Sequence, residues 1–279
     1  MSTSNFRSLL DYSTLPTNKH DIIPLVFLKL VLQSAFIPNT KQLSTLIIAK
    51  AGLGKTIKLD QLRKNPYVYY TVDITPKHFV LFLNKVQERK KRYLVIPDYI
   101  TTLGHAKKTK DLLRGHLRAM MEEGCQDNDA YGLEYHFPKP IKAGLISAIT
   151  PEFFASSSKI WKSDGFLSRF LPFSYSHSPE STKQVLDNIK SKNNPIANFG
   201  MKVRTSGVKE PVRSDDIDNQ IRIMAYDIAS GEPPYRPYLQ MISLCNSSAV
   251  LRESLRVEKQ DIELIRSLLV FINRKQSPI

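Results

Sequence analysis

Two glycines, a lysine and a threonine lie close together in residues 49–56, which read Ala-Lys-Ala-Gly-Leu-Gly-Lys-Thr. Gly52 and Gly54 allow the backbone to curl, so that several N–H groups point toward one place. Such donors bind phosphate oxygens, the amine of Lys55 adds a positive charge, and the hydroxyl of Thr56 is a ligand for Mg²⁺. The spacing therefore predicts that a nucleoside triphosphate, with ATP and Mg²⁺ as the expected pair, binds at Ala51, Gly52, Leu53, Gly54, Lys55 and Thr56.

The elements around this loop fit the same chemistry. Residues 44–48 read as a short apolar strand and residues 57–59 begin a helix, and a phosphate-binding loop requires strand, loop and helix in this order. The positive end of the helix would face the phosphates. Ala49 stands where the pattern GxxxxGK[ST] has its first glycine, so a glycine turn beside an unrelated lysine is the alternative interpretation.

Asp98 is the second residue with a chemical role. It ends the apolar run of residues 93–97, which is typical of a buried strand. A phosphate-binding loop needs an acidic partner for its metal at the end of a neighbouring strand, and we expect Asp98 to hold Mg²⁺ through water. The alternative is an ordinary aspartate in a turn after a strand.

The residue after Asp98 breaks the usual pattern. A glutamate normally follows this aspartate and polarises the attacking water, but here the next residue is Tyr99. Asp73, Glu122 and Glu123 are candidates for the general base, and each is also explained as a surface carboxylate. The sequence therefore predicts ATP hydrolysis and leaves its general base unidentified.

Strands and helices alternate along the first two thirds of the chain. This alternation predicts an α/β fold with a parallel sheet and helices on both faces. We expect helices at residues 18–36, 56–64, 76–91 and 107–123, strands at 43–49, 67–74, 92–97, 141–149 and 170–176, and a hairpin at 131–140.

The composition changes after this alternating region. Residues 178–213 are rich in Ser, Asn, Lys and Pro, and residues 216–273 read as helices only. We therefore expect an N-terminal helical lead-in at 1–40, an ATPase core at 41–178, a basic linker or mobile loop at 179–214, and a small helical lid at 215–279.

The charge balance of the chain favours a polyanionic partner. Its 279 residues carry 40 Lys and Arg against 26 Asp and Glu, a formal net charge of +14. This excess favours a nucleic-acid partner, which we expect to be DNA, although an ordinary basic cytosolic protein is the alternative. The two cysteines show no metal or disulfide spacing, and no signal peptide or membrane-spanning run is evident, so we expect a cytoplasmic protein without membrane contact.

The order of features after residue 120 resembles a known family. A helix ends at Met120–Met121–Glu122–Glu123–Gly124, and the predicted hairpin, the strand before Thr150 and the segment Gly-Phe-Leu-Ser-Arg-Phe at residues 165–170 follow. The helical tail carries Tyr-Arg-Pro-Tyr-Leu-Gln at residues 235–240. These features resemble the ATPase core of AAA+ proteins, and most closely the branch that holds the minichromosome maintenance helicases.

The resemblance implies a fold and a role for several residues. The fold would be a three-layer core with a parallel sheet, followed by a small all-helical lid. Thr150 would be the sensor that positions the attacking water, and Arg169 the finger that reaches the γ-phosphate bound by a neighbouring subunit. Arg236 would be the lid arginine that contacts nucleotide, and Lys139, near the hairpin tip, would face nucleic acid in a central pore.

Each of these four roles has a structural alternative. Thr150 precedes Pro151 and fits a helix N-cap, and Arg169 fits a surface salt bridge. Arg236 and Lys139 fit turns beside proline. A finger that acts on a neighbour requires a closed assembly, so the role of Arg169 implies a hexamer or another ring.

Three functions follow from these observations. The first is a ring-forming ATPase that couples ATP hydrolysis to DNA translocation or remodelling, as a helicase-like motor in DNA replication does. The second is a DNA-bound adaptor, such as a loader or a transposition or partition ATPase, in which ATP binding is a switch and hydrolysis is slow. The third is a remodeller of proteins without DNA.

Overall fold

The computed structural model describes residues 19–130, 133–177, 179–191, 196, 199–229 and 233–272. The chain forms two compact units. Residues 42–174 make up the first, which we call the core unit. The described residues of Met1–Lys41 and Tyr175–Lys275 make up the second, which we call the helical unit.

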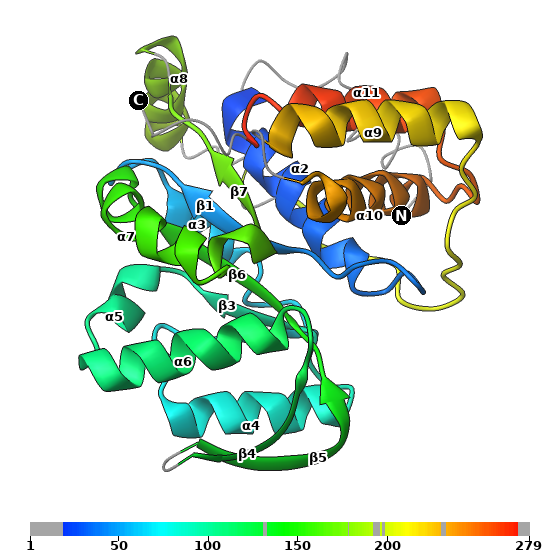
Figure 1. The fold of residues 1–279 in the computed structure, drawn as a ribbon. Coiled ribbons are helices and arrows are strands. Elements are labelled where there is room, and N and C mark those ends of the chain that lie inside the picture. The colour runs from blue at the N-terminus through cyan, green and yellow to red at the C-terminus, as the bar shows by residue number, and fades with distance from the viewer. Residues whose placement is uncertain are drawn as a thin grey trace. The chain divides into compact units, whose positions relative to one another are not determined.

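A five-stranded parallel sheet organises the core unit (Figure 1). Its strands lie in the order β2-β3-β6-β1-β7, and every neighbouring pair is parallel. The predicted α/β fold with a parallel sheet is therefore confirmed. The strands are β1 (Ser44–Ile48), β2 (Val68–Tyr70), β3 (Tyr93–Ile96), β6 (Gly144–Ile149) and β7 (Phe170–Ser174).

The central strands are buried on both faces. Every residue of β1, β3 and β6 is buried, as expected for parallel strands that are covered on each side. Two amphipathic helices, α4 (Pro76–Gln87) and α6 (Lys107–Met120), contribute apolar side chains to one cluster with Leu94, Ile96 and Leu145 of the sheet. Figure 1 shows both helices on the same side of the sheet.

Helices follow several strands at their carboxyl ends. They are α3 (Lys55–Asp60) after β1, α5 (Tyr99–Leu103) after β3 and α7 (Pro151–Ser163) after β6, while the 3-10 helix η1 (Leu167–Arg169) precedes β7. Helix α7 begins with proline at its first position, where a missing N–H costs no hydrogen bond.

The predicted hairpin is present, and it is longer than expected. Strands β4 (Cys125–Ala130) and β5 (Leu133–Ile141) pair antiparallel, with Ala130 opposite Leu133 and Cys125 opposite Ile141. Residues 131 and 132, between the strands, lie outside the described part of the chain. The expected position of Lys139 near the tip is wrong: Lys139 lies toward the base of the hairpin, two residues before Ile141.

The helical unit contains more order than the sequence suggested. Its helices are α2 (Lys19–Ser34), α8 (Pro179–Lys190), α9 (Asp215–Ala229), α10 (Tyr235–Leu251) and α11 (Lys259–Leu268). Helix α2 packs against α10, so the N-terminal helix belongs to this unit and not to the core. No described helix is long and apolar enough to cross a bilayer.

The expected linker at residues 179–214 is not irregular throughout. Residues 179–190 form α8. Glu180 lies in its first turn and Lys190 in its last, and each charge stabilises the helix by its interaction with the helix dipole. Further along, Gln33 of α2 accepts a hydrogen bond from Arg204 N at 2.8 Å and donates one to Arg204 O at 2.9 Å. Arg213 forms ion pairs with Glu210 and Asp218. Part of the basic charge in this segment is therefore paired and not free in solvent.

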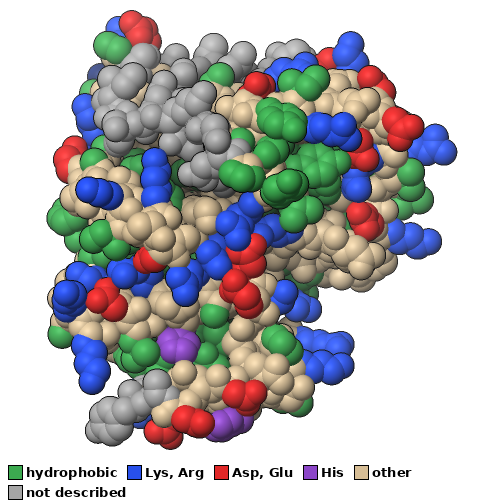
Figure 2. Space-filling view, in the orientation of Figure 1, with side chains coloured by type: hydrophobic (Ala, Val, Ile, Leu, Met, Phe, Trp, Pro, Cys, Tyr) green, Lys and Arg blue, Asp and Glu red, His purple; other side chains and the backbone are tan. Residues whose placement is uncertain are grey.

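Large apolar side chains are exposed where α9 ends and α10 begins. Ile223 and Tyr226 on α9 and Tyr235 and Leu239 on α10 are each between 48% and 79% exposed. Figure 2 shows hydrophobic side chains gathered over this part of the helical unit. Scattered exposed apolar residues are ordinary, but a contiguous group of this kind is typical of a surface that contacts another molecule.

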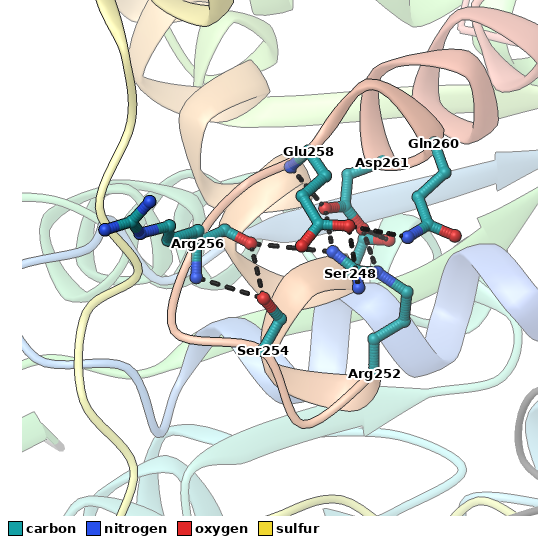
Figure 3. Close-up of polar contacts among 7 residues, drawn as sticks. All are labelled: Ser248, Arg252, Ser254, Arg256, Glu258, Gln260 and Asp261. Carbon is teal, nitrogen blue, oxygen red and sulfur yellow. Dashed lines mark hydrogen bonds and ion pairs between the residues drawn. The ribbon is translucent and has the colours of Figure 1, made fainter.

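A buried carboxylate joins α10 to α11 (Figure 3). Asp261 is fully buried, and its oxygens accept hydrogen bonds from Ser248, from Arg252 and from the backbone N–H of Glu258. The Glu258 side chain also caps α11. The buried charge is therefore paired and hydrogen-bonded, as burial of an ion requires.

Candidate functional site

The loop after β1 has the backbone conformation that its glycines predict. Gly52 and Gly54 have φ values of 83° and 73°, a left-handed region that favours glycine. Gly54 is also the N-cap of α3, so the loop leads directly into the positive end of that helix.

Lys55 folds back over this loop. Its Nζ donates hydrogen bonds to Ala49 O at 2.6 Å and to Lys50 O at 3.0 Å. Partial burial lowers the pKa of Lys55, while the carboxylates of Asp98 and Glu152 act in the opposite direction. The ammonium group therefore lies at the loop and within the field of two carboxylates.

A second lysine supports the loop, and no local sequence pattern indicates its role. Lys58 is only 2% exposed, and its Nζ donates to Leu53 O at 3.3 Å. Lysine is almost never fully buried unless its ammonium group has a partner, and here one partner is a carbonyl oxygen of the loop. Lys58 thus helps to hold the backbone of residues 52–54 from within α3.

The sheet brings Asp98 and Thr150 to the same edge as this loop. Strand β6 lies between β1 and β3, with Ile149 opposite Ile48 and Ser147 opposite Ile96. Ala49 N donates to Ile149 O at 3.3 Å, so the phosphate loop begins beside the residue before Thr150. Ligands of parallel α/β sheets bind at the carboxyl ends of the strands, where these three segments meet.

The oxygen atoms at this edge fit Mg²⁺. Thr56 and Asp98 are both exposed, and hydroxyl and carboxylate oxygens are the hard ligands that Mg²⁺ prefers. Asp98 is also the N-cap of α5, where its Oδ1 accepts from Ile100 N at 3.1 Å. Within the described ranges no three His, Cys, Asp or Glu side chains form a metal cluster, so such an ion would need phosphate and water as further ligands.

Glu152 is a further candidate site residue, and local sequence patterns do not indicate it. Thr150 is the N-cap of α7, and Glu152 lies in the first turn of that helix with its side chain exposed. Hydrogen bonds from its own backbone N–H and from the Thr150 hydroxyl lower the pKa of Glu152, and the charges of Lys50 and Lys55 lower it further. Only the neighbouring strands β1 and β6 reveal this proximity, because Lys55 and Glu152 are far apart in sequence.

Tyr99, which replaces the expected glutamate, is a packing residue. It is 3% exposed, its ring stacks on Phe166 at 6.0 Å between centroids, and it meets Trp161 edge-on at 5.5 Å. Burial raises the pKa of the Tyr99 hydroxyl well above its usual range. Tyr99 therefore remains protonated and does not act as a base.

The three carboxylates that the sequence offers as candidate bases, Asp73, Glu122 and Glu123, all have other partners. Asp73 Oδ2 lies 2.6 Å from Nε2 of His105. Both glutamates form ion pairs with Arg169. Glu122 Oε2 lies 3.2 Å from its Nε, and Glu123 Oε1 lies 2.9 Å from its Nη2.

Arg169 is held within its own core unit. Its side chain is 10% exposed, and besides the two ion pairs it donates to Gly165 O at 2.5 Å. The structural alternative, a salt bridge, is thus observed in this state of the chain. The finger role stays a prediction, and it would require the guanidinium to exchange these carboxylates for a phosphate.

No described contact within the core unit joins Arg236 or Lys139 to the phosphate loop. Arg236 lies in the first turn of α10 in the helical unit and is half-buried. Lys139 is exposed on β5 of the hairpin. Their expected roles, contact with nucleotide and with nucleic acid, stay predictions.

Solved structures with similar folds are known. An MCM homolog from Methanopyrus kandleri aligns with 96% of this chain at a TM-score of 0.53 and 16% identity. This chain shares the fold of that homolog. It spans 60% of the length of that homolog. A candidate ATPase from Cytophaga hutchinsonii aligns with 94% of the chain and 86% of its own length, at a TM-score of 0.46 and 12% identity.

Comparison of sequences assigns no family to the chain. No protein-family model and no curated protein sequence matches the chain. An identity of 16% establishes the fold alone, so the chemistry has to be argued from the residues of this chain.

Proposed function

We propose that this chain is an AAA+ ATPase that binds ATP with Mg²⁺ at residues 51–56 and hydrolyses its γ-phosphate. The observation that carries the proposal is the meeting of three chain segments at one sheet edge. The phosphate loop with Lys55, the Asp98 carboxylate and Thr150 follow three adjacent parallel strands. Each supplies a group that phosphoryl transfer needs.

The chemistry assigned to each group is electrostatic. Backbone N–H groups of the loop and the positive end of α3 would bind the β- and γ-phosphates. Lys55 would place its ammonium where negative charge develops in the transition state. Thr56 and Asp98 would hold Mg²⁺, which when bound neutralises phosphate charge. Thr150 would orient the attacking water.

Nucleotide binding and phosphate release test this part of the proposal. The unmodified chain should bind a fluorescent ATP analogue in the presence of Mg²⁺ and release inorganic phosphate from ATP. Asp98→Asn should retain part of the binding and lose most of the phosphate release, because the carboxylate is needed for the metal and not for the loop. Hydrolysis that is unchanged in Asp98→Asn would contradict the role given to Asp98.

We further propose that the ATPase works as a ring on DNA, as a helicase-like motor. The net charge of +14 supports a polyanionic partner, and the AAA+ fold shared with an MCM homolog supports the motor class. DNA should stimulate ATP turnover, and its binding should weaken steeply with added salt because phosphate contacts release counterions. Lys139→Ala should reduce DNA affinity if nucleic acid contacts the exposed residues toward the base of the hairpin.

Ring formation is supported by Arg169 and by the exposed apolar residues of the helical unit. If Arg169 reaches a neighbour's nucleotide, Arg169→Ala subunits should lower the turnover of unmodified subunits when the two are mixed. Light scattering with and without nucleotide should show an oligomer that depends on ATP. Unchanged turnover in the mixtures would contradict the finger role.

The alternative is an ATP-switched DNA adaptor, such as a loader or a transposition or partition ATPase. The burial of Tyr99 at the position of the usual glutamate favours slow hydrolysis. A single slow turnover per binding event would support the adaptor, and fast steady turnover would support the motor. Absence of DNA binding at low salt would favour the third function, a remodeller of proteins.

A further inference from the structure

Hydrolysis at this site needs a base, and the usual position does not provide one. Tyr99 is buried among Trp161 and Phe166, and Asp73, Glu122 and Glu123 are engaged with His105 and Arg169. The following inference rests on the proposed ATPase function. It concerns a carboxylate in the first turn of α7, the helix that follows β6, and β6 is the strand next to β1.

Glu152 has the position that a base requires. Its helix α7 starts directly after β6, the strand between β1 with the phosphate loop and β3 with Asp98. Backbone hydrogen bonds fix this start: Ala49 N donates to Ile149 O at 3.3 Å, and Phe154 N donates to Thr150 O at 3.0 Å. Glu152 therefore lies in a turn anchored beside the loop, between the two segments that bind phosphate and metal.

The local charges agree with this position. Glu152 and Asp98 are the two carboxylates that act on the Lys55 ammonium. The Glu152 side chain is exposed, whereas Tyr99 is closed off in the core. An exposed carboxylate has room for a water molecule, and its nearby lysines keep it ionised at neutral pH.

We propose that Glu152 is the general base of ATP hydrolysis and replaces the glutamate that Tyr99 displaces. A water oxygen attacks the γ-phosphorus while a carboxylate oxygen of Glu152 accepts a proton from that water. The bond between the γ-phosphorus and the β–γ bridging oxygen breaks, and its electron pair leaves with ADP. The products are ADP and inorganic phosphate, and the proton on Glu152 returns to solvent.

Thr150 acts through Glu152 as a positioning residue. Thr150 is the N-cap of α7, two residues before Glu152, and its hydroxyl makes no hydrogen bond with the backbone N–H groups that it could cap. The hydroxyl is one of the groups that lower the pKa of Glu152, so the expected sensor and the base lie in the same turn. Thr150→Val should lower turnover less than the loss of the carboxylate does, because the carboxylate remains in place.

The test compares Glu152→Gln with Glu152→Asp and a matched control. Glu152→Gln should bind the fluorescent ATP analogue with a Kd within about threefold of the unmodified chain and lower single-turnover hydrolysis about 10²- to 10⁴-fold. Glu152→Asp should restore part of that loss, because it keeps a carboxylate on a shorter stem. Glu88→Gln, the same change at an exposed residue after α4, should leave turnover unchanged.

A pH profile separates a base from a structural residue. Hydrolysis by the unmodified chain should fall as acid protonates Glu152, and the residual rate of Glu152→Gln should lack that dependence. Turnover of Glu152→Gln within about threefold of normal, or a loss explained by weaker ATP binding, would overturn the inference. If the unmodified chain binds but never hydrolyses ATP, the proposed ATPase function fails, which is a different result from an active chain that tolerates Glu152→Gln.

Discussion

Replacing Asp261 by alanine should destabilise the helical unit strongly. The fully buried carboxylate accepts from Ser248 Oγ at 2.6 Å, from Arg252 at 3.0 and 2.7 Å, and from Glu258 N at 2.9 Å. Breaking a buried ion pair on one side costs about 3–5 kcal/mol, because it leaves the other charge without compensation. Arg252 keeps an ion pair with Glu258 at 3.3 Å, so we expect a loss near the lower end, about 3 kcal/mol.

Urea unfolding followed by circular dichroism measures this loss. With a slope of about 2 kcal/mol per molar urea, a loss of about 3 kcal/mol moves the midpoint down by about 1.5 M. Glu263→Ala is the matched control, because Glu263 lies on the same helix and forms only an exposed pair with Lys259 at 3.8 Å. Its midpoint should stay within about 0.3 M of normal. Equal midpoints for Asp261→Ala and the control would refute the reasoning about the buried pair.

Three further predictions concern other buried positions. Burial lowers the pKa of Lys29 to about 8 from 10.5, which corresponds to about 3 kcal/mol of lost stability at pH 7. Lys29→Met should therefore stabilise the helical unit, by less than that amount because the substitution also removes the contacts of the ammonium group, among them the cation–π contact with Phe199. The unfolded chain binds more protons than the folded chain between pH 8 and 10.5, so this advantage should shrink as pH rises through that window, and a gain that stays constant would contradict the cause. Gly144→Ala should lower the free energy of unfolding by about 1–3 kcal/mol in thermal or urea unfolding, because the added Cβ would overlap the Tyr93 ring and lie 2.8 Å from Leu43 O. Gly115→Ala is the control, because a Cβ there meets nothing within 4 Å and should not destabilise the protein. Tyr99→Phe should keep ATP hydrolysis within about twofold of normal, since the hydroxyl has no role in proton transfer, and a large loss of hydrolysis would restore Tyr99 as a candidate.

The parts of the site that are local in sequence could be predicted. The phosphate loop needs two left-handed glycines, a lysine and a threonine within a few positions, and Gly52 and Gly54 have that conformation. Asp98 follows an apolar strand, and the strand itself is visible as a run of buried residue types. Such signals depend on neighbouring residues only, so no knowledge of the sheet order is needed.

The parts that depend on distant pairs could not be predicted. Glu152 becomes a site residue only because β6 lies between β1 and β3, an order that local patterns do not specify. The ion pairs of Arg169 with Glu122 and Glu123 likewise join residues 46 or more positions apart. The polar composition of residues 179–214 predicts a linker or mobile loop, although the charges at the two ends of residues 179–190 favour the helix α8.

The most direct test of the central claim is equilibrium binding of a fluorescent ATP analogue with Mg²⁺ to the unmodified chain and to Lys55→Ala. The account predicts saturable binding that Lys55→Ala weakens by about tenfold or more, with circular dichroism unchanged because Lys55 is half-exposed at the first position of α3. Lys159→Ala, on the exposed side of α7, should bind as the unmodified chain does. Absence of binding to the unmodified chain, or equal binding by Lys55→Ala, would contradict the claim that this loop holds the nucleotide.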